Sequence, residues 1–264
     1  MIPKIIHYCW IGGAPLPELA KKCIESWKKC CPDYEIKEWN ESNYDFTQNV
    51  YMKEAYEAKK WGFVPDYARL DIIYRYGGFY LDTDVELLKS LDPFCTEKFY
   101  MGCEAREAVS PGLGFGAEQG TPLLKEMMDS IYGDRHFICK DGSLDVTPSP
   151  RLNTNFLREK GLRLDGSIEK LDCGMTIYPA EYFAPKDFKT GQVVLTDKTY
   201  SIHHYDASWM EPEDKQVLRI KWAMEKYKGV GKIVTYTSTK LLGLKRHLRM
   251  QGLQGTIQYI RDKR

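Results

Sequence analysis

The sequence predicts an α/β fold in which a mostly parallel central sheet is flanked by helices. At its start, residues 5–11 form an apolar strand pattern, residues 19–29 have helical spacing, and residues 34–39 alternate as a second strand. A β–α–β start favours a parallel sheet with helices packed on it. With 264 residues and 43% apolar composition, the chain can bury the core of one large domain.

The first predicted strand runs into the glycine pair Gly12-Gly13 directly after Trp10. Glycine lets a ligand come close to the backbone, so Trp10 is a candidate for stacking on a nucleotide base. The alternative is that Trp10 belongs to the core. The chain contains no GxGxxG and no GxxxxGK[ST], which excludes the usual dinucleotide-binding and P-loop motifs.

Residues 50–60 predict a further helix, and residues 64–86 are the stretch around which the chain is organised. Pro65 suits a first helical turn, and Gly77-Gly78 suit the end of that helix. Asp66 and Arg69 are three residues apart and share one helix face. Their pairing is either a local ion pair or a ligand-facing surface, with Arg69 near phosphate and Asp66 accepting from sugar hydroxyls.

A short apolar strand over residues 79–81 ends in Asp82-Thr83-Asp84. In an extended segment the two aspartates point the same way, about 6–7 Å apart at Cα. Carboxylates this close repel each other unless a cation neutralises them, and oxygen ligands select Mg²⁺ or Mn²⁺, which keep open positions for phosphates. A solvated turn is the alternative, but the preceding strand and glycine pair favour a cation site.

The segments IPKIIHYCWIGG and PDYARLDIIYRYGGFYLDTDVE resemble the glycosyltransferases with a DXD-containing sugar-binding region. That group includes bacterial capsular-polysaccharide transferases, yeast initiating mannosyltransferases and, more distantly, the glucosyltransferase domain of large clostridial toxins. The resemblance covers roughly the first hundred residues. It implies a GT-A type nucleotide-sugar-binding fold, Mn²⁺ or Mg²⁺, and retention at the anomeric carbon.

The resemblance also implies roles for single residues. Trp10 would stack on the base and Tyr80 would lie by the ribose, while Asp66 and Arg69 would contact the donor sugar. Asp82 would touch ribose or sugar and bind the metal through water, and Asp84 would bind it directly.

In the second half, residues 99–104 predict a strand, residues 112–119 are glycine-rich, and residues 122–132 and 151–156 predict helices. Relatives line the donor sugar and acceptor cleft with this region. The resemblance therefore marks these residues as loose candidates: Glu104, Gly114, Glu118, Asn153 and Asn155. For the two asparagines, a role in a turn or a helix cap is the alternative.

Residues 199–209 (TYSIHHYDASW) predict a strand ending at two histidines, where relatives close the active site with a loop. Adjacent side chains on a strand point to opposite faces, so His203 and His204 cannot both face a metal. We choose His204 as the third cation ligand or diphosphate contact, since imidazole suits Mn²⁺ better than Mg²⁺. Ser208 and Trp209 would cap the diphosphate and exclude water.

We expect a catalytic domain over residues 1–211 and a basic helical extension over residues 212–264. Residues 219–264 carry 12 Lys and Arg against 2 acids, although the whole chain has a net charge of +1. The extension would either lie on an anionic membrane surface near a lipid-linked acceptor or dock on the body of the domain. The spacing of the eight cysteines matches no zinc site, and no signal peptide or apolar membrane span is evident. We therefore expect a cytoplasmic protein, which would lie on the inner face of the membrane if the extension binds there.

Together these observations predict a bacterial-type, metal-dependent, retaining hexosyltransferase that acts in surface or capsular polysaccharide synthesis. The expected partners are a nucleotide-diphosphate sugar, with UDP-sugars favoured, and a saccharide or lipid-linked acceptor; no nucleic acid is expected. Two alternatives stay open. The first is a metal-dependent phosphohydrolase or nucleotidyltransferase, which also builds its site from paired aspartates, and the second is a non-catalytic carbohydrate-binding protein.

Overall fold

The computed structural model describes residues 1–104, 108–208, 210–227 and 229–262 of the chain. It divides into two compact units, which are described separately. The first unit contains residues 1–186 and 193–206, and the second contains residues 187–192 and 207–264.

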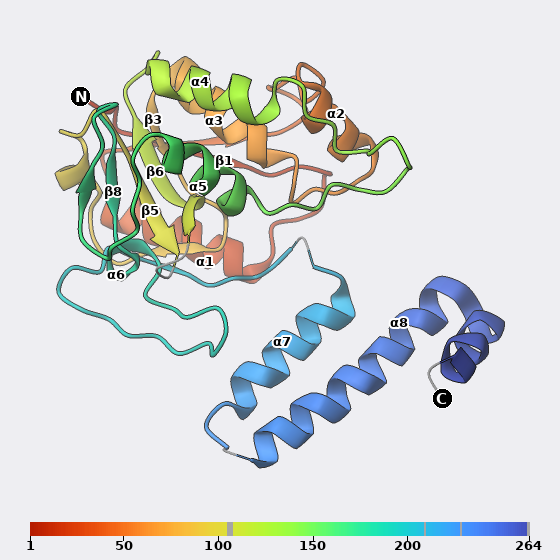
Figure 1. Ribbon diagram of the computed structural model, residues 1–264. Helices are drawn as coiled ribbons and strands as arrows, with labels where there is room; N and C mark the ends of the chain where they lie inside the picture. Colours follow the sequence, from red (N-terminus) through yellow and green to blue (C-terminus); the bar gives the residue numbers. More distant parts are fainter. Residues whose placement is uncertain (105–107, 209, 228, 263–264) are drawn as a thin grey trace. The chain divides into compact units, whose positions relative to one another are not determined.

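The first unit contains the sheets and all the helices that pack on them (Figure 1). In chain order its elements are β1 (Ile5–Cys9), α1 (Glu18–Cys30), β2 (Glu35–Trp39), α2 (Val50–Glu57), α3 (Pro65–Tyr76), β3 (Gly78–Tyr80), β4 (Val85–Leu87), the 3-10 helix η1 (Asp92–Phe94), β5 (Phe99–Glu104), β6 (Ala108–Ala117), α4 (Pro122–Tyr132), α5 (Ser149–Glu159), β7 (Glu169–Lys170), β8 (Thr176–Tyr178), α6 (Ala180–Phe183) and β9 (Ser201–His203).

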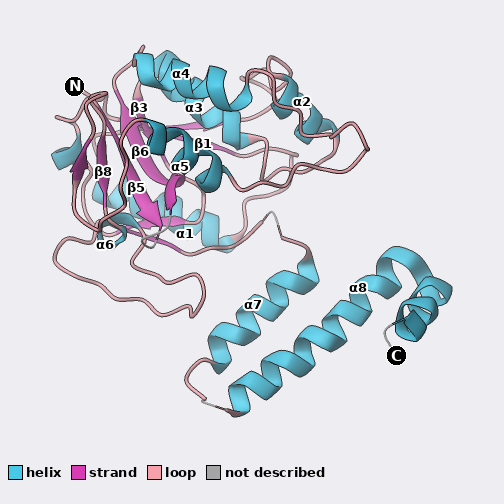
Figure 2. Ribbon diagram, viewed as in Figure 1, coloured by secondary structure: helices cyan, strands magenta, loops and turns pink. Residues whose placement is uncertain are grey.

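The central sheet has seven strands in the order β2-β1-β3-β6-β5-β8-β7 (Figure 2). Strands β1, β2, β3, β5 and β8 run in one direction, and β6 and β7 run in the other. The predicted α/β class with a mostly parallel sheet is confirmed. The glycine-rich stretch over residues 112–119 lies largely within β6, the antiparallel strand between β3 and β5.

Helices cover both faces of this sheet. Helices α2, α3, α4 and α5 contribute to one hydrophobic cluster, and α1, η1 and α6 contribute to the cluster on the other face. Along β3 the buried side chains alternate between these clusters: Phe79 belongs to the α1 side and Tyr80 to the α3 side. Because β1, β3, β5 and β8 run in the same direction, their carboxyl ends lie at the same edge of the sheet.

The connection between α3 and β3 depends on Gly77 and Gly78, which have φ angles of 64° and 101°. Gly77 ends the helix by donating its N–H to Ile73 O over 2.8 Å. A Cβ on Gly78 would lie 2.7 Å from Ile5 O, so only glycine fits where β3 joins β1. This turn feeds the chain directly into β3 and the aspartates that follow.

A second, two-stranded sheet joins distant parts of the chain at the same edge. Strands β4 and β9 pair antiparallel, with Val85 opposite His203 and Glu86 opposite Ile202. Because β4 begins directly after Asp84, this pairing places the end of β9 beside the two aspartates.

The second unit is a helical hairpin of α7 (Pro212–Met224) and α8 (Val230–Asp262) (Figure 1). Ion pairs join the two helices: Arg246 contacts Asp214 at 2.7 Å and Arg249 contacts Glu213 at 2.8 Å. Gly252 interrupts α8 with φ 66° and ψ −173°. Among the described helices, none combines the length and the apolar character that crossing a bilayer requires.

Candidate active site

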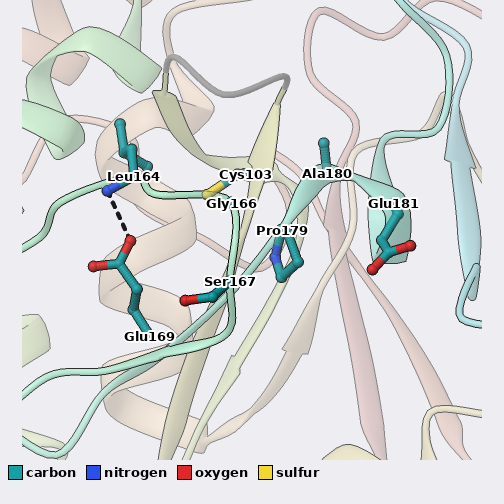
Figure 3. Close-up of a pocket in the computed structure, with 8 residues that line it drawn as sticks. All are labelled: Cys103, Leu164, Gly166, Ser167, Glu169, Pro179, Ala180 and Glu181. Carbon is teal, nitrogen blue, oxygen red and sulfur yellow. Dashed lines mark hydrogen bonds between the residues drawn. The ribbon is translucent and has the colours of Figure 1, made fainter.

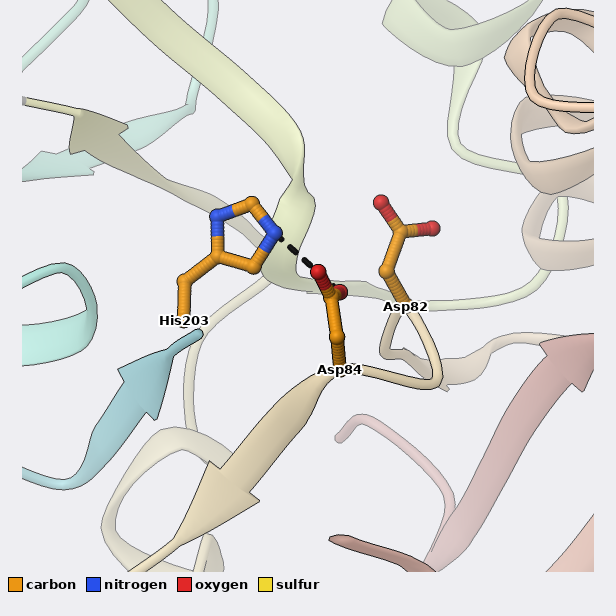
Figure 4. Close-up of side chains that lie close together, drawn as sticks. All are labelled: Asp82, Asp84 and His203. Carbon is orange, nitrogen blue, oxygen red and sulfur yellow. Dashed lines mark ion pairs between the residues drawn. The ribbon is translucent and has the colours of Figure 1, made fainter. Parts of the chain in front are cut away.

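Three side chains from two distant segments converge at the carboxyl end of β3. One ligand atom each of Asp82, Asp84 and His203 lies within 4.8 Å of the others, and all three side chains are half-buried. In Figure 4 the imidazole of His203, at the end of β9, faces the carboxylate of Asp84, at the start of β4, and Asp82 lies on the other side of Asp84. Within the described part of the chain, this is the group of acidic and imidazole side chains that could hold a metal ion.

The two aspartates reach this position through a turn. We expected an extended Asp82–Asp84 segment, but Val85 N donates to Asp82 O over 3.0 Å, which closes a turn. Asp82 N in turn donates to Gly112 O on β6 over 3.1 Å. The carboxylates converge because this backbone turn is anchored to the neighbouring strand.

The histidine at the carboxylates is His203, which corrects our choice of His204. His203 Nε2 lies 3.2 Å from Asp84 Oδ1, whereas His204 Nε2 lies 2.7 Å from Glu86 Oε2. The register explains the difference, because Glu86 opposes Ile202 and His204 shares the strand face of Ile202. Only one histidine faces the site, as expected, but the register that selects it depends on long-range pairing.

Asp84 is held as an ionised carboxylate. Asp206 N donates to its Oδ2 over 2.7 Å, and His204 N donates to its backbone oxygen over 2.9 Å. Although burial alone would raise its pKa, the charge and hydrogen bond of His203 and the Asp206 N–H lower the pKa of Asp84 to about 2. Nearby charges of Asp84 and Asp82 conversely raise the pKa of His203 against the effect of burial.

The segment after β9 has an unusual backbone. Tyr205 has a φ angle of 56°, a left-handed conformation that is uncommon for a tyrosine. Its ring centroid lies 4.2 Å from that of His203. The strained residue thus packs directly against the imidazole and fixes its orientation beside Asp84.

On the other side of the cluster, Arg69 is buried and links α3 to the aspartates. Its guanidinium contacts Asp66 Oδ1 at 3.0 Å and Asp82 Oδ2 at 3.5 Å, while its Nε donates to Pro65 O over 2.9 Å. Burial raises the pKa of Asp66 to about 6 despite the charge of Arg69. Burial likewise raises the pKa of Asp82, again opposed by Arg69. The predicted ion pair of Asp66 and Arg69 is present and is joined to Asp82 through Arg69, and its contact with a donor sugar stays a prediction.

Gly112 on β6 makes room for the Asp82 carboxylate. A Cβ at this position would lie 2.1 Å from Asp82 Oδ2 and 3.0 Å from Arg69 Nη1. No larger residue could occupy position 112 without displacing the carboxylate. Sequence reasoning noted the glycine-rich stretch but could not identify which glycine the site requires.

Tyr80 and Trp10, the two predicted nucleotide contacts, lie at the carboxyl ends of the neighbouring strands β3 and β1. Tyr80 is fully buried, with the Arg69 guanidinium 5.2 Å from its ring centroid, so it supports Arg69. Trp10 follows β1 at the same sheet edge, is half-buried, and donates from Nε1 to Ala14 O over 2.5 Å. Their contacts with ribose and base stay predictions.

Two further charged groups interact with the cluster: Glu104, one of the loose candidates, and Lys186, which the sequence did not mark. Lys186 Nζ donates to His204 O over 2.7 Å; burial lowers its pKa, and the charge of Asp84 opposes that effect. Burial raises the pKa of Glu104, at the end of β5, and the nearby charge of His203 opposes this rise. Lys186 lies in no motif, so no sequence pattern could have found it.

Three of the other four loose candidates make contacts with residues outside the cluster. Glu118 pairs with the N-terminal ammonium of Met1, and Gly114 adopts a φ of 126° against the Leu81 side chain. Asn153 is buried and donates to Ser149 O over 2.7 Å, whereas Asn155 is exposed.

Neither of the two predicted capping residues belongs to the described part of the first unit. Ser208 belongs to the second unit, which is described by itself, and Trp209 lies outside the described residues. Their role in covering a diphosphate stays a prediction.

A pocket of about 300 Å³ opens where β5 and β8 end (Figure 3). Its lining comes from the end of β5, the segment before β7 and the start of α6: Cys103, Leu164, Gly166, Ser167, Glu169, Pro179, Ala180 and Glu181. Glu169 is buried and accepts from Leu164 N over 2.7 Å, so it shapes the wall. The pocket and the cluster occupy the same carboxyl edge of the sheet.

The residues present fit a divalent cation. Two carboxylates and one imidazole form the donor set, and this combination suits Mn²⁺ or Mg²⁺, with the imidazole favouring Mn²⁺. His203 Nε2, which lies 3.2 Å from Asp84 Oδ1, is the ring nitrogen that faces the carboxylates. Arg69 neutralises part of the charge of Asp82, but Asp84 keeps a full negative charge for a cation to bind.

Comparison with known proteins supports the resemblance. Residues 17–100 match the family model described as a glycosyltransferase sugar-binding region containing a DXD motif, a span that includes Asp66, Arg69, Asp82 and Asp84. The resemblance to these glycosyltransferases is thus confirmed for the first part of the chain.

Curated relatives match over similar lengths. Inositol phosphoceramide mannosyltransferase 3 of Schizosaccharomyces pombe is 30% identical over 137 residues, covering 49% of this chain and 37% of that protein. Inositol phosphoceramide mannosyltransferase 1 of the same yeast is 27% identical over 149 residues, covering 52% and 45%. The chain spans less than half the length of these relatives.

Two solved structures show more distant likeness. PaToxG glycosyltransferase matches with a TM-score of 0.45 and 20% identity, covering 60% of this chain and 69% of that chain. A glycosyltransferase involved in glycosylation of the major capsid of PBCV-1 matches with a TM-score of 0.42 and 11% identity, covering 82% and 100%.

Proposed function

We propose that this protein is a metal-dependent glycosyltransferase that moves a hexose from a nucleotide-diphosphate sugar to a saccharide or lipid-linked acceptor. The observation that carries the proposal is the convergence of Asp82, Asp84 and His203 beside buried Arg69. The family match over residues 17–100 supports it, because that span supplies both aspartates and the arginine.

Asp66 and Arg69 bind and orient the donor sugar in this proposal. Arg69 is held on three sides, by Pro65 O, Asp66 and Asp82, so its guanidinium is fixed before the donor arrives. Trp10, at the carboxyl end of the neighbouring strand β1, stacks on the base. These groups place the anomeric carbon next to the paired carboxylates.

Asp82, Asp84 and His203 would hold Mn²⁺ or Mg²⁺, and the bound cation would neutralise negative charge on the departing nucleoside diphosphate. Lys186, whose ammonium donates to His204 O and interacts electrostatically with Asp84, would add a second positive charge for the same diphosphate. Both charges act on the leaving group, where negative charge develops as the glycosidic bond breaks.

The proposed reaction retains the anomeric configuration. The acceptor hydroxyl oxygen forms a bond to the anomeric carbon on the face from which the diphosphate leaves. The bond between that carbon and the phosphate oxygen breaks, and the hydroxyl proton passes to the departing phosphate oxygen. No covalent sugar–enzyme bond is required, so the side chains bind, orient and shield the reactants.

The acceptor is proposed to enter through the pocket that Ser167 and Ala180 line, because it opens at the sheet edge that carries the cluster. The names of the yeast relatives, inositol phosphoceramide mannosyltransferases, support a lipid-borne acceptor and make mannose a candidate sugar. UDP-hexoses and GDP-mannose are the donors to compare, in a role in surface or capsular polysaccharide synthesis.

The test is hydrolysis and transfer by purified protein across UDP-galactose, UDP-glucose, UDP-N-acetyl sugars and GDP-mannose, each with and without Mn²⁺. We expect Mn²⁺-dependent release of sugar from one donor. Asp84→Ala should abolish turnover with an unchanged thermal midpoint, whereas Glu86→Ala, which removes a carboxylate outside the cluster, should keep it.

Two results would overturn the proposal. Unchanged turnover in Asp84→Ala, or tight nucleotide binding that ignores metal, would remove the cation site from the chemistry. Release of phosphate or pyrophosphate without movement of sugar would instead favour the phosphohydrolase or nucleotidyltransferase alternative.

A further inference from the structure

Helix α8 exposes an apolar stripe along its first part. Val230, Ile233, Leu241 and Leu248 are exposed by 64%, 66%, 69% and 48%. Their spacing of three, eight and seven residues places them on one side of a helix. Large aliphatic side chains are normally buried, so four exposed ones on one side of a helix indicate a surface that binds something.

The opposite side of α8 is the one that packs against α7. Gly231 is buried there, and a Cβ on it would lie 2.3 Å from Met224 O at the end of α7. Arg246 and Arg249 pair with Asp214 and Glu213 of α7 on this same side. The hairpin therefore uses one side of α8 for its own packing and leaves the apolar stripe on the other.

The charge around the stripe has a single sign. From Val230 to Gln251, α8 contains five Lys and Arg and neither Asp nor Glu. The second unit as a whole carries 14 Lys and Arg against 6 Asp and Glu, whereas the first carries 24 against 31. The net charges are therefore about +8 and −7, so the positive charge of the chain is concentrated on the unit with the stripe.

We propose that this face of α8 docks on an anionic lipid surface. A helix with an exposed aliphatic stripe and flanking Lys and Arg lies in the membrane interface, with its apolar side chains among the acyl chains and its cations at the headgroups. Lys240, whose Nζ lies 5.4 Å from the centroid of the Tyr236 ring, extends along that ring and can reach headgroup phosphates.

The charge pattern argues against a second copy of this chain as the occupant. Two α8 helices joined through their stripes would bring Lys and Arg against Lys and Arg, with no acid between residues 230 and 251 to pair with them. An anionic leaflet removes this repulsion and adds attraction. The inference does not depend on the proposed function, because lipid binding is measured without donor or acceptor.

The test is sedimentation of the full chain with vesicles of phosphatidylcholine alone or with roughly one third phosphatidylglycerol. We expect binding to the anionic vesicles, at least about tenfold weaker binding to the neutral ones, and loss of binding as salt rises from about 0.1 M to about 0.5 M. Equal binding to both vesicles, or no binding at low salt, would overturn the proposal.

Matched variants separate the stripe from general charge. Leu241→Glu places an acid in the stripe, and Thr239→Glu adds the same charge two residues away, on another side of α8. Leu241→Glu should weaken vesicle binding about tenfold or more, and Thr239→Glu should weaken it less. Both positions are exposed, and circular dichroism checks that the helices persist. Equal effects of the two variants, or concentration-dependent self-association without lipid that only Leu241→Glu removes, would overturn the lipid assignment.

Discussion

The imidazole of His203 lies 3.2 Å from the carboxylate of Asp84, although the two residues are far apart in the sequence. The contact exists because β9 pairs with β4 directly beside the Asp82–Asp84 turn. The neighbouring His204 faces Glu86 on the other side of the ribbon. This arrangement adds a third candidate ligand to the two aspartates and lets the two histidines be tested against each other.

We predict that His203→Ala weakens Mn²⁺ binding by about tenfold or more, because it removes one of three ligands. His204→Ala, the matched control, removes only the contact with Glu86 and should leave Mn²⁺ affinity within about twofold. Isothermal titration of each variant with Mn²⁺ alone measures the difference. A larger loss for His204→Ala would return the ligand assignment to our original choice.

Gly112 gives a second test, at a residue that carries no chemistry of its own. Gly112→Ala should displace the Asp82 carboxylate, since the added Cβ would lie 2.1 Å from Oδ2. We expect metal-dependent nucleotide affinity to fall by about tenfold or more with little change in the thermal midpoint, because a half-exposed side chain can move aside. Fluorescence titration with UDP and GDP in Mn²⁺ measures the affinity.

Gly116→Ala is the matched variant on the same strand. Its Cβ would lie 2.9 Å from the Tyr100 ring and 3.0 Å from the Phe79 ring, both fixed in the core. This change should lower stability by about 1–3 kcal/mol and leave nucleotide affinity nearly unchanged in the folded fraction. The opposite pattern in the two variants would contradict the role given to Gly112.

The local parts of the site could be predicted from the sequence. Asp66 and Arg69 are three residues apart on one helix, so short-range spacing was enough to place them together. The spacing of Asp82 and Asp84 marked them as a pair, but their carboxylates converge through a turn and not through the extended segment we expected. The connection of the two pairs through Arg69 Nη1 and Asp82 Oδ2 then followed from the fold. Likewise, the β–α–β start predicted the parallel strands β1 and β2.

The long-range parts could not be predicted. His203 was missed because its face depends on the register of β9 against β4, and a shift of one residue reverses every side chain. Lys186 lies in no motif, and its hydrogen bond to His204 O and its electrostatic interaction with Asp84 both arise from the fold. The need for glycine at position 112 depends on how closely β6 passes the Asp82 carboxylate.

The pocket at the ends of β5 and β8 gives a third prediction. Ser167→Trp fills part of the roughly 300 Å³ space and should lower transfer to the acceptor about tenfold or more. Mn²⁺-dependent hydrolysis of the donor by water should persist, because the cation cluster is unchanged. Separate assays of transfer and hydrolysis measure the two effects.

Ser143→Trp is the control for this change. Ser143 and Ser167 make the same turn, each donating from Oγ to an aspartate two residues earlier over 2.6 Å, but Ser143 does not line the pocket. The control should leave transfer within about twofold of the wild type. An equal loss in both variants, or none in Ser167→Trp, would remove the pocket from acceptor binding.

The last prediction concerns His7, a fully buried histidine of β1. Trp39 Nε1 donates to its Nδ1 over 3.0 Å, and its Nε2 lies 2.9 Å from Gly77 O, so the neutral ring satisfies both nitrogens. A proton on Nδ1 would face the indole N–H. Burial is the main cause that lowers the pKa of His7 to about 4, while the bond to Gly77 O opposes it.

Because this folded-state pKa lies below the unfolded value of about 6.5, the unfolded chain binds more protons between the two values. The contribution of His7 to stability is therefore complete above about pH 6.5 and is lost as pH falls towards 4, to a total of about 3 kcal/mol. Urea unfolding of wild type should show about 2 kcal/mol of this loss between pH 7.5 and pH 5. His7→Gln keeps a donor and an acceptor without titrating, so its stability should lack that slope. Parallel pH profiles for the two proteins would show that His7 has the same pKa in the folded and unfolded chain, so its hydrogen bonds do not select the neutral ring.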